Sequence, residues 1–383
     1  MIAEFGLRNS DSVNIQGRSN LGGSTTYMPY RNLYYQVVHW DNLLLAWCQA
    51  RKGKRSRSAA ASFELEAAEH LLQLQDELIA KSYRHGNYHN FVIHEPKQRL
   101  ISAAPFADRI VHHALCNVIE PIFERCFIHD SYANRKGKGT HAALDCCQAF
   151  ATLYPFVLQC DVRQFFSAID HAILLHTLQR QVVDPDVLWL CEEIMRSGEG
   201  VLSNVYEMHY FPSDDLFAIN RPRGLPIGNL TSQFWANVYL NQLDHFIKRK
   251  LKCKAFLRYV DDFLLFADDK QTLRSWRREI IDFLAELRLI LHENRCQSKP
   301  VGEGIPFLGF VIFPDYRRLK RRKGIEFQRR FRANLQAYQA NEISFEQLTA
   351  SVQGWVNHVR YAETYGLRRT IFGNYPIQPP KSS

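Results

Sequence analysis

The feature that most constrains this chain is a pair of adjacent aspartates, Asp261 and Asp262, set between two short apolar runs. The runs are Ala255–Leu257 and Phe263–Phe266. Two such runs joined by a few residues predict two strands with a tight turn between them, so both carboxylates project into one small space. Like charges held so close repel each other unless a cation neutralises them, which favours a divalent metal. The alternative is an ordinary surface turn, in which Asp is a common residue.

A third aspartate strengthens the metal interpretation. Asp161 ends a separate apolar run, Phe156–Cys160, which also predicts a strand. A carboxylate at a neighbouring strand end would complete a two-metal site, with the ions about 3.5–4 Å apart. In such a site one metal activates a 3′-hydroxyl for in-line attack, and the other holds a triphosphate and stabilises the pyrophosphate leaving group.

The net charge, the short apolar runs and the cysteine spacing limit the classes of protein to which this chain could belong. The formal net charge of +9 predicts attraction to polyanions, either nucleic acids or anionic membranes. The longest apolar stretch, Leu43–Cys48, is far shorter than the roughly 18 residues that a bilayer span needs. Met1–Ser10 contains no apolar run for a signal peptide, and the scattered cysteines form no C-x-x-C pair that would predict a zinc site or a disulfide framework. We expect a cytoplasmic protein with reduced thiols and no membrane partner.

The pattern along the chain predicts an α+β core between mainly helical flanks. The polar residues 1–30 predict a flexible N-terminal tail. Helical spacing of apolar residues predicts one helix over 65–79, with Ser62 as its N-cap, and a second over 108–123. The other predicted elements are strands at 156–160, at 306–313 and, in two pieces, within 255–267, and helices within 226–247 and over 334–383.

Three ordered motifs carry a resemblance to a known family. They are Asp161 with Phe165-Phe166, the segment Gly224–Gln233, and Tyr259–Asp262, and in this order they resemble the palm motifs of reverse transcriptases. Other segments are similar to the family's fingers motifs, namely 91–101, 107–115 and 130–140, and 307–310 is similar to its primer-grip hairpin. The resemblance implies a right-hand polymerase fold, divided into the tail 1–30, fingers with the first palm elements at 31–155, a palm with an antiparallel sheet at 156–315, and a helical thumb with the C-terminal tail at 316–383.

The resemblance also implies a metal site and a selectivity residue. Asp161 and Asp261 would be the principal metal ligands, aided by the Val162 carbonyl. Asp262 would be the supporting carboxylate, and the cofactor would be two Mg²⁺ ions, which Mn²⁺ could replace. Phe166 falls where the family has its steric gate, a ring that collides with a ribose 2′-hydroxyl and so selects deoxynucleotides. The alternative for Phe166 is an ordinary buried Phe.

Further implied contacts are with the nucleotide and with the template–primer duplex. Lys97 and Arg99 would supply cations to the incoming triphosphate, unless they belong to a solvated basic loop. Ile227 and Gly228 would lie beside the nascent base pair. Two basic segments, Arg51–Arg57 and Arg317–Arg332, would contact backbone phosphates, unless they only solvate helix faces. The expected template and primer contacts are Tyr259, Phe307, Leu308, Gly309, Arg317, Arg318, Lys320, Arg321 and Arg322.

Two departures from the family pattern refine the expectation. Most relatives carry Gln at the position of Ile227, and an Ile cannot hydrogen-bond there. The segment Ile227–Gln233 looks like the variant typical of reverse transcriptases in diversity-generating retroelements, which copy a template RNA unfaithfully at adenines. Similar segments occur in other bacterial reverse transcriptases, including some antiphage systems. Arg295 stands where relatives usually have Lys, and Arg does not readily give up a proton.

The expected partners are an RNA template, a primer or cDNA strand and dNTPs, and the diversity-generating resemblance adds a small basic helical accessory protein. Few residues follow Gly309, so we expect a thumb there and no ribonuclease H, integrase or endonuclease domain. Two alternatives stay open. One is an antiphage-defence reverse transcriptase that copies a dedicated non-coding RNA. The other is a non-catalytic RNA-binding or maturase-like protein.

Overall fold

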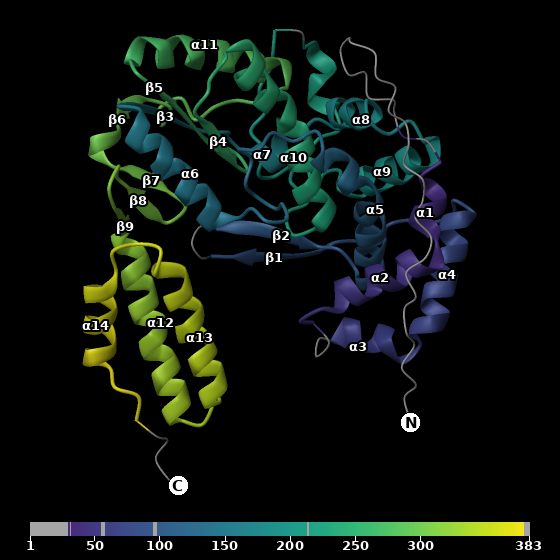
Figure 1. Cartoon of the computed structure of the whole chain (residues 1–383). Coiled ribbons are helices and arrows are strands. Elements are labelled where there is room, and N and C mark those ends of the chain that lie inside the picture. Colours follow the sequence, from purple (N-terminus) through teal and green to yellow (C-terminus); the bar gives the residue numbers. More distant parts are fainter. Residues whose placement is uncertain (1–29, 31, 55–57, 95–97, 213, 379–383) are drawn as a thin grey trace, which may run out of the picture.

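The structure is a computed structural model that describes residues 30, 32–54, 58–94, 98–212 and 214–378. It has an α+β fold with three small antiparallel sheets, in agreement with the predicted fold class (Figure 1). Residues 1–29 of the predicted tail, residues 55–57 of the first basic segment and Lys97 lie outside the described residues. Tyr30 is described and pairs with Val182. No helix within the described ranges combines the length and apolar character needed to cross a bilayer.

The N-terminal part is helical and corrects one prediction. Instead of one helix capped by Ser62, the chain forms two, and Ser62 lies inside the first of them. The backbone leaves the helical conformation at Glu66, although the buried residues Phe63, Leu71 and Leu78 continue one helical spacing across the break. The second predicted helix is confirmed as α5. The elements are α1 (Tyr34–Val38), α2 (Trp40–Arg51), α3 (Ser58–Leu65), α4 (Ala67–Ile79) and α5 (Phe106–Glu124).

A four-stranded antiparallel sheet forms the centre of the molecule, and its strands confirm the predicted runs. The spatial order is β4-β5-β3-β6. Along β3 and β5 alternate residues face opposite sides, so Leu158 and Phe263 enter one hydrophobic cluster and Val157 and Leu264 enter another. The strands are β3 (Phe156–Asp161), β4 (Phe256–Tyr259), β5 (Asp262–Ala267) and β6 (Ser298–Pro300).

Helices cover both faces of this sheet (Figure 1). One face packs against α10 and α11, and the other against α6 and a second, three-stranded sheet. Helix α10 agrees with the helix predicted within 226–247. The helices are α6 (Thr140–Leu153), α7 (Phe165–Ala168), α8 (His171–Gln179), α9 (Pro185–Ser197), α10 (Leu230–His245) and α11 (Lys270–Glu286), with short helical turns η1 (Leu216–Asn220), η2 (Phe246–Lys250) and η3 (Val301–Glu303).

The run 306–313, predicted as one strand, folds back on itself. Leu308 and Gly309 have φ values of 44° and 92°, a left-handed pair that reverses the chain in a two-residue hairpin turn. The sheet that results has the order β7-β8-β9. Its strands are β7 (Ile305–Phe307), β8 (Phe310–Ile312) and β9 (Arg317–Leu319).

The C-terminal part is helical, as predicted. Three helices pack around an aromatic core of their own that includes Phe327, Phe331 and Trp355. They are α12 (Arg321–Gln339), α13 (Phe345–Val359) and α14 (Tyr365–Asn374). A separate two-stranded ribbon, β1 (His89–Ile93) with β2 (Arg99–Ala103), extends beside the central sheet (Figure 1).

Candidate active site

The three predicted carboxylates come together at one end of the central sheet. Asp161 ends β3 and is the direct cross-strand partner of Asp262, which begins β5. Asp261 lies in the tight turn between β4 and β5, and its carbonyl accepts a hydrogen bond from the Val162 amide at 3.3 Å. The predicted hairpin and the predicted neighbouring strand are therefore both present, and their register brings the carboxylates to the same end of the sheet.

Cations lie next to Asp161. Its Oδ2 is 3.7 Å from Arg295 Nη1 and 4.0 Å from His292 Nε2, and its side chain is 31% exposed. The His292 amide donates to the Asp161 carbonyl at 2.9 Å, so the chain after α11 runs alongside the end of β3. Arg295 thus places a positive charge beside the candidate catalytic carboxylate.

Asp262 has an unusual electrostatic environment. Burial raises the pKa of Asp262 to about 7, and the charges of Asp161 and Asp261 act in the same direction. The amide of Gln159 opposes the shift by donating to Asp262 Oδ1 at 3.2 Å. Because burial and mutual repulsion disfavour the ionised form of Asp262, a bound cation that offsets the negative charge would be favourable here.

The donor set fits a hard divalent cation. Three carboxylates and the Val162 carbonyl offer only oxygen, which Mg²⁺ and Mn²⁺ prefer. Within the described ranges, no three His, Cys, Asp or Glu side chains already surround a single ion position. The fit therefore rests on the chemistry of the oxygen donors and on the electrostatic environment of Asp262, not on preformed coordination geometry.

Gln159 is a site residue that the sequence analysis missed. Its amide nitrogen donates both to Asp262 and to the Pro306 carbonyl in β7, at 3.2 and 3.1 Å. It therefore links the supporting carboxylate to the hairpin that carries Leu308 and Gly309. The signal in the sequence is its position two residues before Asp161, which puts both side chains on the same face of β3.

The expected nucleotide-side residues lie on α7 and on the loop before α10, which are connected by hydrogen bonds. The Phe166 carbonyl accepts from the Leu225 amide at 2.8 Å, and the Ile227 carbonyl accepts from the Ser102 amide of β2, also at 2.8 Å. Gly228 has φ of 119°, and a side chain there would approach Ile101 Cγ2 at 2.9 Å. Phe166, Ile227, Gly228 and the base of the β1–β2 ribbon are thus held together.

Of the two residues expected to bind the triphosphate, the structure describes Arg99 but not Lys97. Arg99 is exposed at the start of β2, opposite Ile93 on β1. Lys97 lies outside the described residues. The ribbon that carries Arg99 is joined through Ser102 to the Ile227 loop, so this cation and that loop belong to one assembly.

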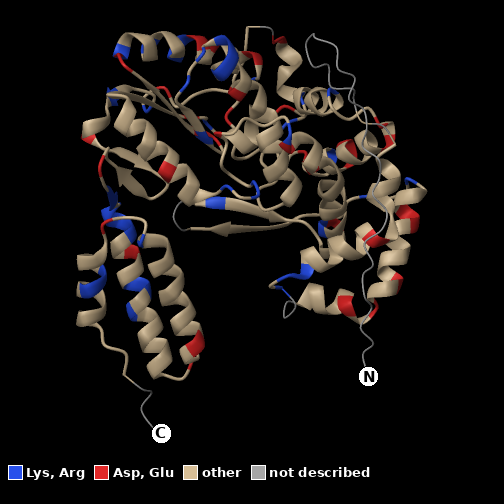
Figure 2. Ribbon diagram, in the orientation of Figure 1, with Lys and Arg blue, Asp and Glu red and all other residues tan. Residues whose placement is uncertain are grey.

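The expected template and primer residues fall into two groups. Tyr259 contacts Thr140 through its hydroxyl at 3.1 Å, and Phe307 is fully buried below the hairpin turn of Leu308 and Gly309. The basic residues gather at β9 and the start of α12 (Figure 2). Arg318, Arg321 and Arg322 are exposed, Lys320 is partly buried, and Arg317 is engaged by Asp145 and Gln148 of α6 at 2.6 and 2.7 Å.

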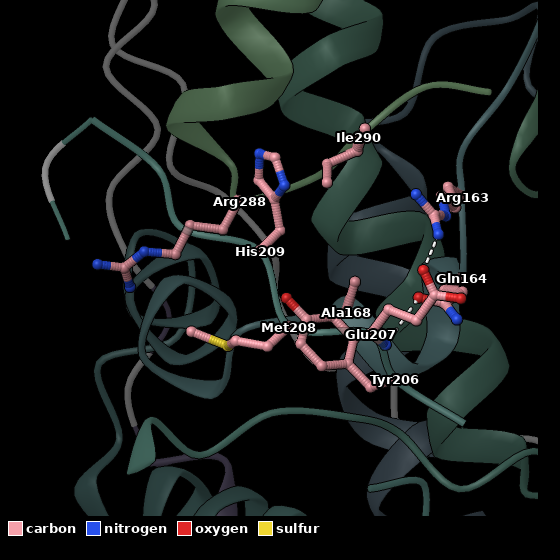
Figure 3. A pocket seen from close by; sticks show the side chains of 9 residues that line it. All are labelled: Arg163, Gln164, Ala168, Tyr206, Glu207, Met208, His209, Arg288 and Ile290. Atoms are coloured by element: carbon pink, nitrogen blue, oxygen red, sulfur yellow. Dashed lines mark hydrogen bonds and ion pairs between the residues drawn. The ribbon is translucent and has the colours of Figure 1, made fainter. Parts of the chain in front are cut away.

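A small pocket is lined in part by Arg163 and Gln164, which follow Asp161 closely in the chain (Figure 3). Arg163 pairs with Glu207 on its wall, Gln164 donates to the Val205 carbonyl at 2.6 Å, and Tyr206 and Arg288 complete much of the lining. Its volume of about 40 Å³ holds only a few water molecules. It is therefore no binding site for a nucleotide.

Asn229 fastens the Ile227 loop to the ribbon, although its position before α10 is that of a helix cap. Its side-chain amide instead donates to the carbonyls of Ser102 and Pro226, at 2.9 and 3.1 Å, and accepts from the Ala104 amide at 3.1 Å. The residue is 4% exposed, so water has little access to these groups.

We expect Asn229→Ala to lower the free energy of unfolding by about 2–4 kcal/mol, because it leaves buried polar groups of the backbone without partners. Urea unfolding followed by circular dichroism measures this. Asn334→Ala is the matched control, since Asn334 makes one partly buried bond to Ser351 at 3.1 Å and its loss costs about 1 kcal/mol. Equal effects of the two substitutions would contradict the role given to Asn229.

Comparison with known proteins agrees with this geometry. Residues 92–312, which contain all three carboxylates, match the family model described as "Reverse transcriptase (RNA-dependent DNA polymerase)". The chain is 24% identical over 279 residues to Protein YkfC of Escherichia coli, covering 62% of this chain and 69% of that protein.

Intron-encoded proteins and maturases are also similar. Nuclear intron maturase 1, mitochondrial, of Arabidopsis thaliana is 31% identical over 286 residues, covering 54% of this chain and 40% of that protein. Group II intron-encoded protein LtrA of Lactococcus lactis is 25% identical over 151 residues, covering 39% of this chain and 23% of that protein. The chain thus spans less than half of these two longer relatives. Because the family model matches more than half of it, this chain belongs to the reverse transcriptase family.

Proposed function

We propose that the protein is an RNA-directed DNA polymerase that extends a primer with deoxynucleotides on an RNA template. The observation that supports this most is the cross-strand pairing of Asp161 with Asp262, with Asp261 in the adjoining turn, inside the region that matches the family. The net charge of +9 suits a nucleic-acid substrate.

In this proposal the carboxylates hold Mg²⁺, the ion that reverse transcriptases generally use. Asp161, Asp261 and the Val162 carbonyl would be the ligands, with Asp262 in support, and Mn²⁺ could replace Mg²⁺. When bound, the two ions would activate the 3′-hydroxyl and stabilise the leaving pyrophosphate. The chain's own task is to position these oxygens, and Gln159 does so for Asp262.

We further propose that the structure divides as a right hand. Fingers at 31–155 would include the β1–β2 ribbon with Arg99 and Lys97, the palm at 156–315 would hold the carboxylates, and the thumb at 316–383 would contribute α12–α14. The duplex would contact Tyr259, the hairpin turn of Leu308 and Gly309, and the basic residues of β9 and α12. The exposure of Arg318, Arg321 and Arg322 supports a phosphate contact. Arg317 would act by fixing β9 to α6.

The biological role we propose is diversity generation with error-prone copying at adenines and a small basic accessory protein. The segment Ile227–Gln233 supports it, because Ile227 offers no hydrogen bond beside the nascent base pair. A defence enzyme that copies a dedicated RNA would carry a similar segment. A maturase-like RNA-binding protein is the candidate from another class, and the similarity to a protein named an intron maturase favours it.

Primer extension with the purified full chain tests these proposals. A DNA primer on a heteropolymeric RNA template should be extended in the presence of Mg²⁺ and dNTPs, and chelation should stop the reaction. No incorporation with either Mg²⁺ or Mn²⁺, together with tight RNA binding, would favour the maturase-like candidate. Sequencing of the cDNA separates the polymerase roles, since errors concentrated at template adenines favour diversity generation and faithful or repetitive cDNA favours defence.

Phe166 provides a separate prediction about substrate choice. Its ring is partly buried and contacts Phe165 edge-on at 5.4 Å between centroids, so it is held on its neighbour. We expect Phe166→Ala to lower the preference for dNTPs over rNTPs by about 10–100-fold, the magnitude of a lost steric contact in a specificity pocket. Single-nucleotide incorporation with matched dNTP and rNTP pairs measures the ratio. An unchanged ratio would mean that Phe166 is an ordinary buried side chain.

A further inference from the structure

A buried arginine lies directly behind the turn that carries Asp261. Arg258 in β4 is 0% exposed, as is Asp244 near the end of α10. Its Nε and Nη2 bind the two carboxylate oxygens of Asp244, each at 2.7 Å. Its Nη1 donates to Asn237 Oδ1 at 3.1 Å and to the Val260 carbonyl at 2.9 Å. One guanidinium thus joins α10 to the turn between β4 and β5.

The turn itself is strained. Val260 has φ of 59°, a left-handed conformation that a β-branched residue rarely adopts and that costs about 1–3 kcal/mol. Such a conformation persists only where surrounding contacts hold it. The hydrogen bonds at this turn include the one from Arg258 to the Val260 carbonyl and the one from the Val162 amide to the Asp261 carbonyl, and the Val260 side chain packs against the main hydrophobic cluster.

Arg258 and its partner Asn237 are held by further hydrogen bonds. Its backbone amide donates to the Asp130 carbonyl at 2.9 Å, and its carbonyl accepts from the Tyr132 amide at 3.0 Å. Asn237, which is 3% exposed, is itself fixed by a bond to the Ala133 carbonyl at 2.9 Å. Asn237 and Asp244 are seven residues apart on α10 and therefore share a face of that helix.

From this geometry we propose that Arg258 is a positioning residue, which holds Val260 in its left-handed conformation and thereby sets the place of the Asp261 carboxylate. Asp244 and Asn237 fix the guanidinium so that one N–H of Nη1 is aimed at the turn. The inference rests on the proposed polymerase function for its kinetic consequence only. Its structural consequence, a strained turn restrained through the Arg258 side chain, is independent of any activity.

A purely structural ion pair is the competing explanation. A buried Arg–Asp pair can serve packing alone, and then its loss would lower stability without a specific link to the turn. The two explanations differ in how Arg258 and Val260 depend on each other. Glycine adopts positive φ without strain, so Val260→Gly removes the need for a restraint at that residue. It does not change any packing role of the Arg258–Asp244 pair.

The experiment is a double-mutant cycle of Arg258→Lys and Val260→Gly in the full chain. Lysine keeps the buried charge but is a point donor that cannot span Asp244, Asn237 and the Val260 carbonyl. We expect Arg258→Lys to lower kcat by about 100-fold through displacement of Asp261, with KM for dNTP changed by less than about threefold. Adding Val260→Gly should restore kcat by about tenfold or more.

Melting temperature provides a readout that does not need activity. Val260→Gly removes the strain of the turn and, in both backgrounds alike, the packing of the partly buried Val260 side chain. The change in melting temperature that it causes should therefore be less favourable in the Arg258→Lys background, where the turn has already relaxed. Equal increments in the two backgrounds, or a kcat loss that Val260→Gly does not lift, would overturn the inference. An inactive wild-type enzyme would instead contradict the proposed function, and the melting cycle would still decide the inference.

A substitute for Arg258→Lys and a matched control complete the experiment. If Arg258→Lys does not fold, the pair Arg258→Met with Asp244→Leu removes both buried charges together and enters the same cycle, because apolar replacement of a whole buried pair is often tolerated. Arg221→Lys is the matched control, since Arg221 joins Asp170 and Asp214 at 3.1 and 2.5 Å without contacting the turn. Rescue of that control by Val260→Gly would overturn the inference.

Discussion

Asp161→Asn and Asp261→Asn are each expected to reduce the rate of nucleotide incorporation by about 10³-fold or more. An amide keeps the size of the carboxylate but loses its charge and one acceptor oxygen, so it cannot hold a metal ion equally well. A loss of this size corresponds to about 4 kcal/mol of transition-state stabilisation. Single-turnover incorporation at saturating dNTP, repeated over a range of Mg²⁺ concentrations, measures it.

The three carboxylates should not be equivalent. Asp262 shares its space with two other carboxylates, is engaged by Gln159, and is proposed only to support the site. We therefore expect Asp262→Asn to lose about 10–100-fold, less than either principal ligand. Asp282→Asn, an exposed change on α11, is the matched control and should leave the rate unchanged. If Asp161→Asn or Asp261→Asn kept more than about a tenth of the wild-type rate, that residue would have no essential part in the chemistry.

The central site was predictable because strand geometry is local. An apolar run that ends in a carboxylate, and a second pair of runs joined by Asp261 and Asp262, leave few arrangements for a sheet. Antiparallel pairing of β3 with β5 then puts Asp161 opposite Asp262. The same reasoning predicted α5 and the C-terminal helices, where apolar residues recur at helical spacing.

The residues that hold the site in place were not predictable in the same way. Gln159 reaches Asp262, which is 103 residues away in sequence, and Asn229 reaches Ser102 across 127 residues. Such bonds depend on which elements pack together, and an apolar pattern does not specify that. Asn229 stands at the N-cap position of α10, but its side chain bonds to the ribbon and not to the helix.

Two errors in the predicted elements have the same origin. The break at Glu66 lies within a continuous helical spacing of buried residues, which runs from Ala60 in α3 to Leu78 in α4. The run 306–313 is apolar enough for one strand, but Leu308 and Gly309 both adopt positive φ and turn it into a hairpin, which only the resemblance of 307–310 to the primer-grip hairpin implied. In both cases the apolar pattern continues through the break, so the pattern alone does not reveal it.

Trp355→Ala is the substitution expected to destabilise the protein most. The indole is 7% exposed and stacks on Phe327 with ring centroids 3.7 Å apart and planes 2° from parallel. Phe372 packs edge-on against both rings. Truncation of a buried aromatic residue costs about 3–5 kcal/mol, which is a large part of the stability that a small helical unit has.

We expect this loss to appear locally, because α12–α14 have their own hydrophobic core. Hydrogen exchange should speed up across these helices, while the central sheet keeps its protection. If the helices hold the template–primer duplex, as proposed for a thumb, the variant should still add a single nucleotide but release the primer early, so extension products become short. Phe345→Ala, at an aromatic residue of α13 that is 53% exposed, is the control and should change neither measurement. Products of unchanged length from a variant with melted C-terminal helices would show that these helices do not hold the duplex.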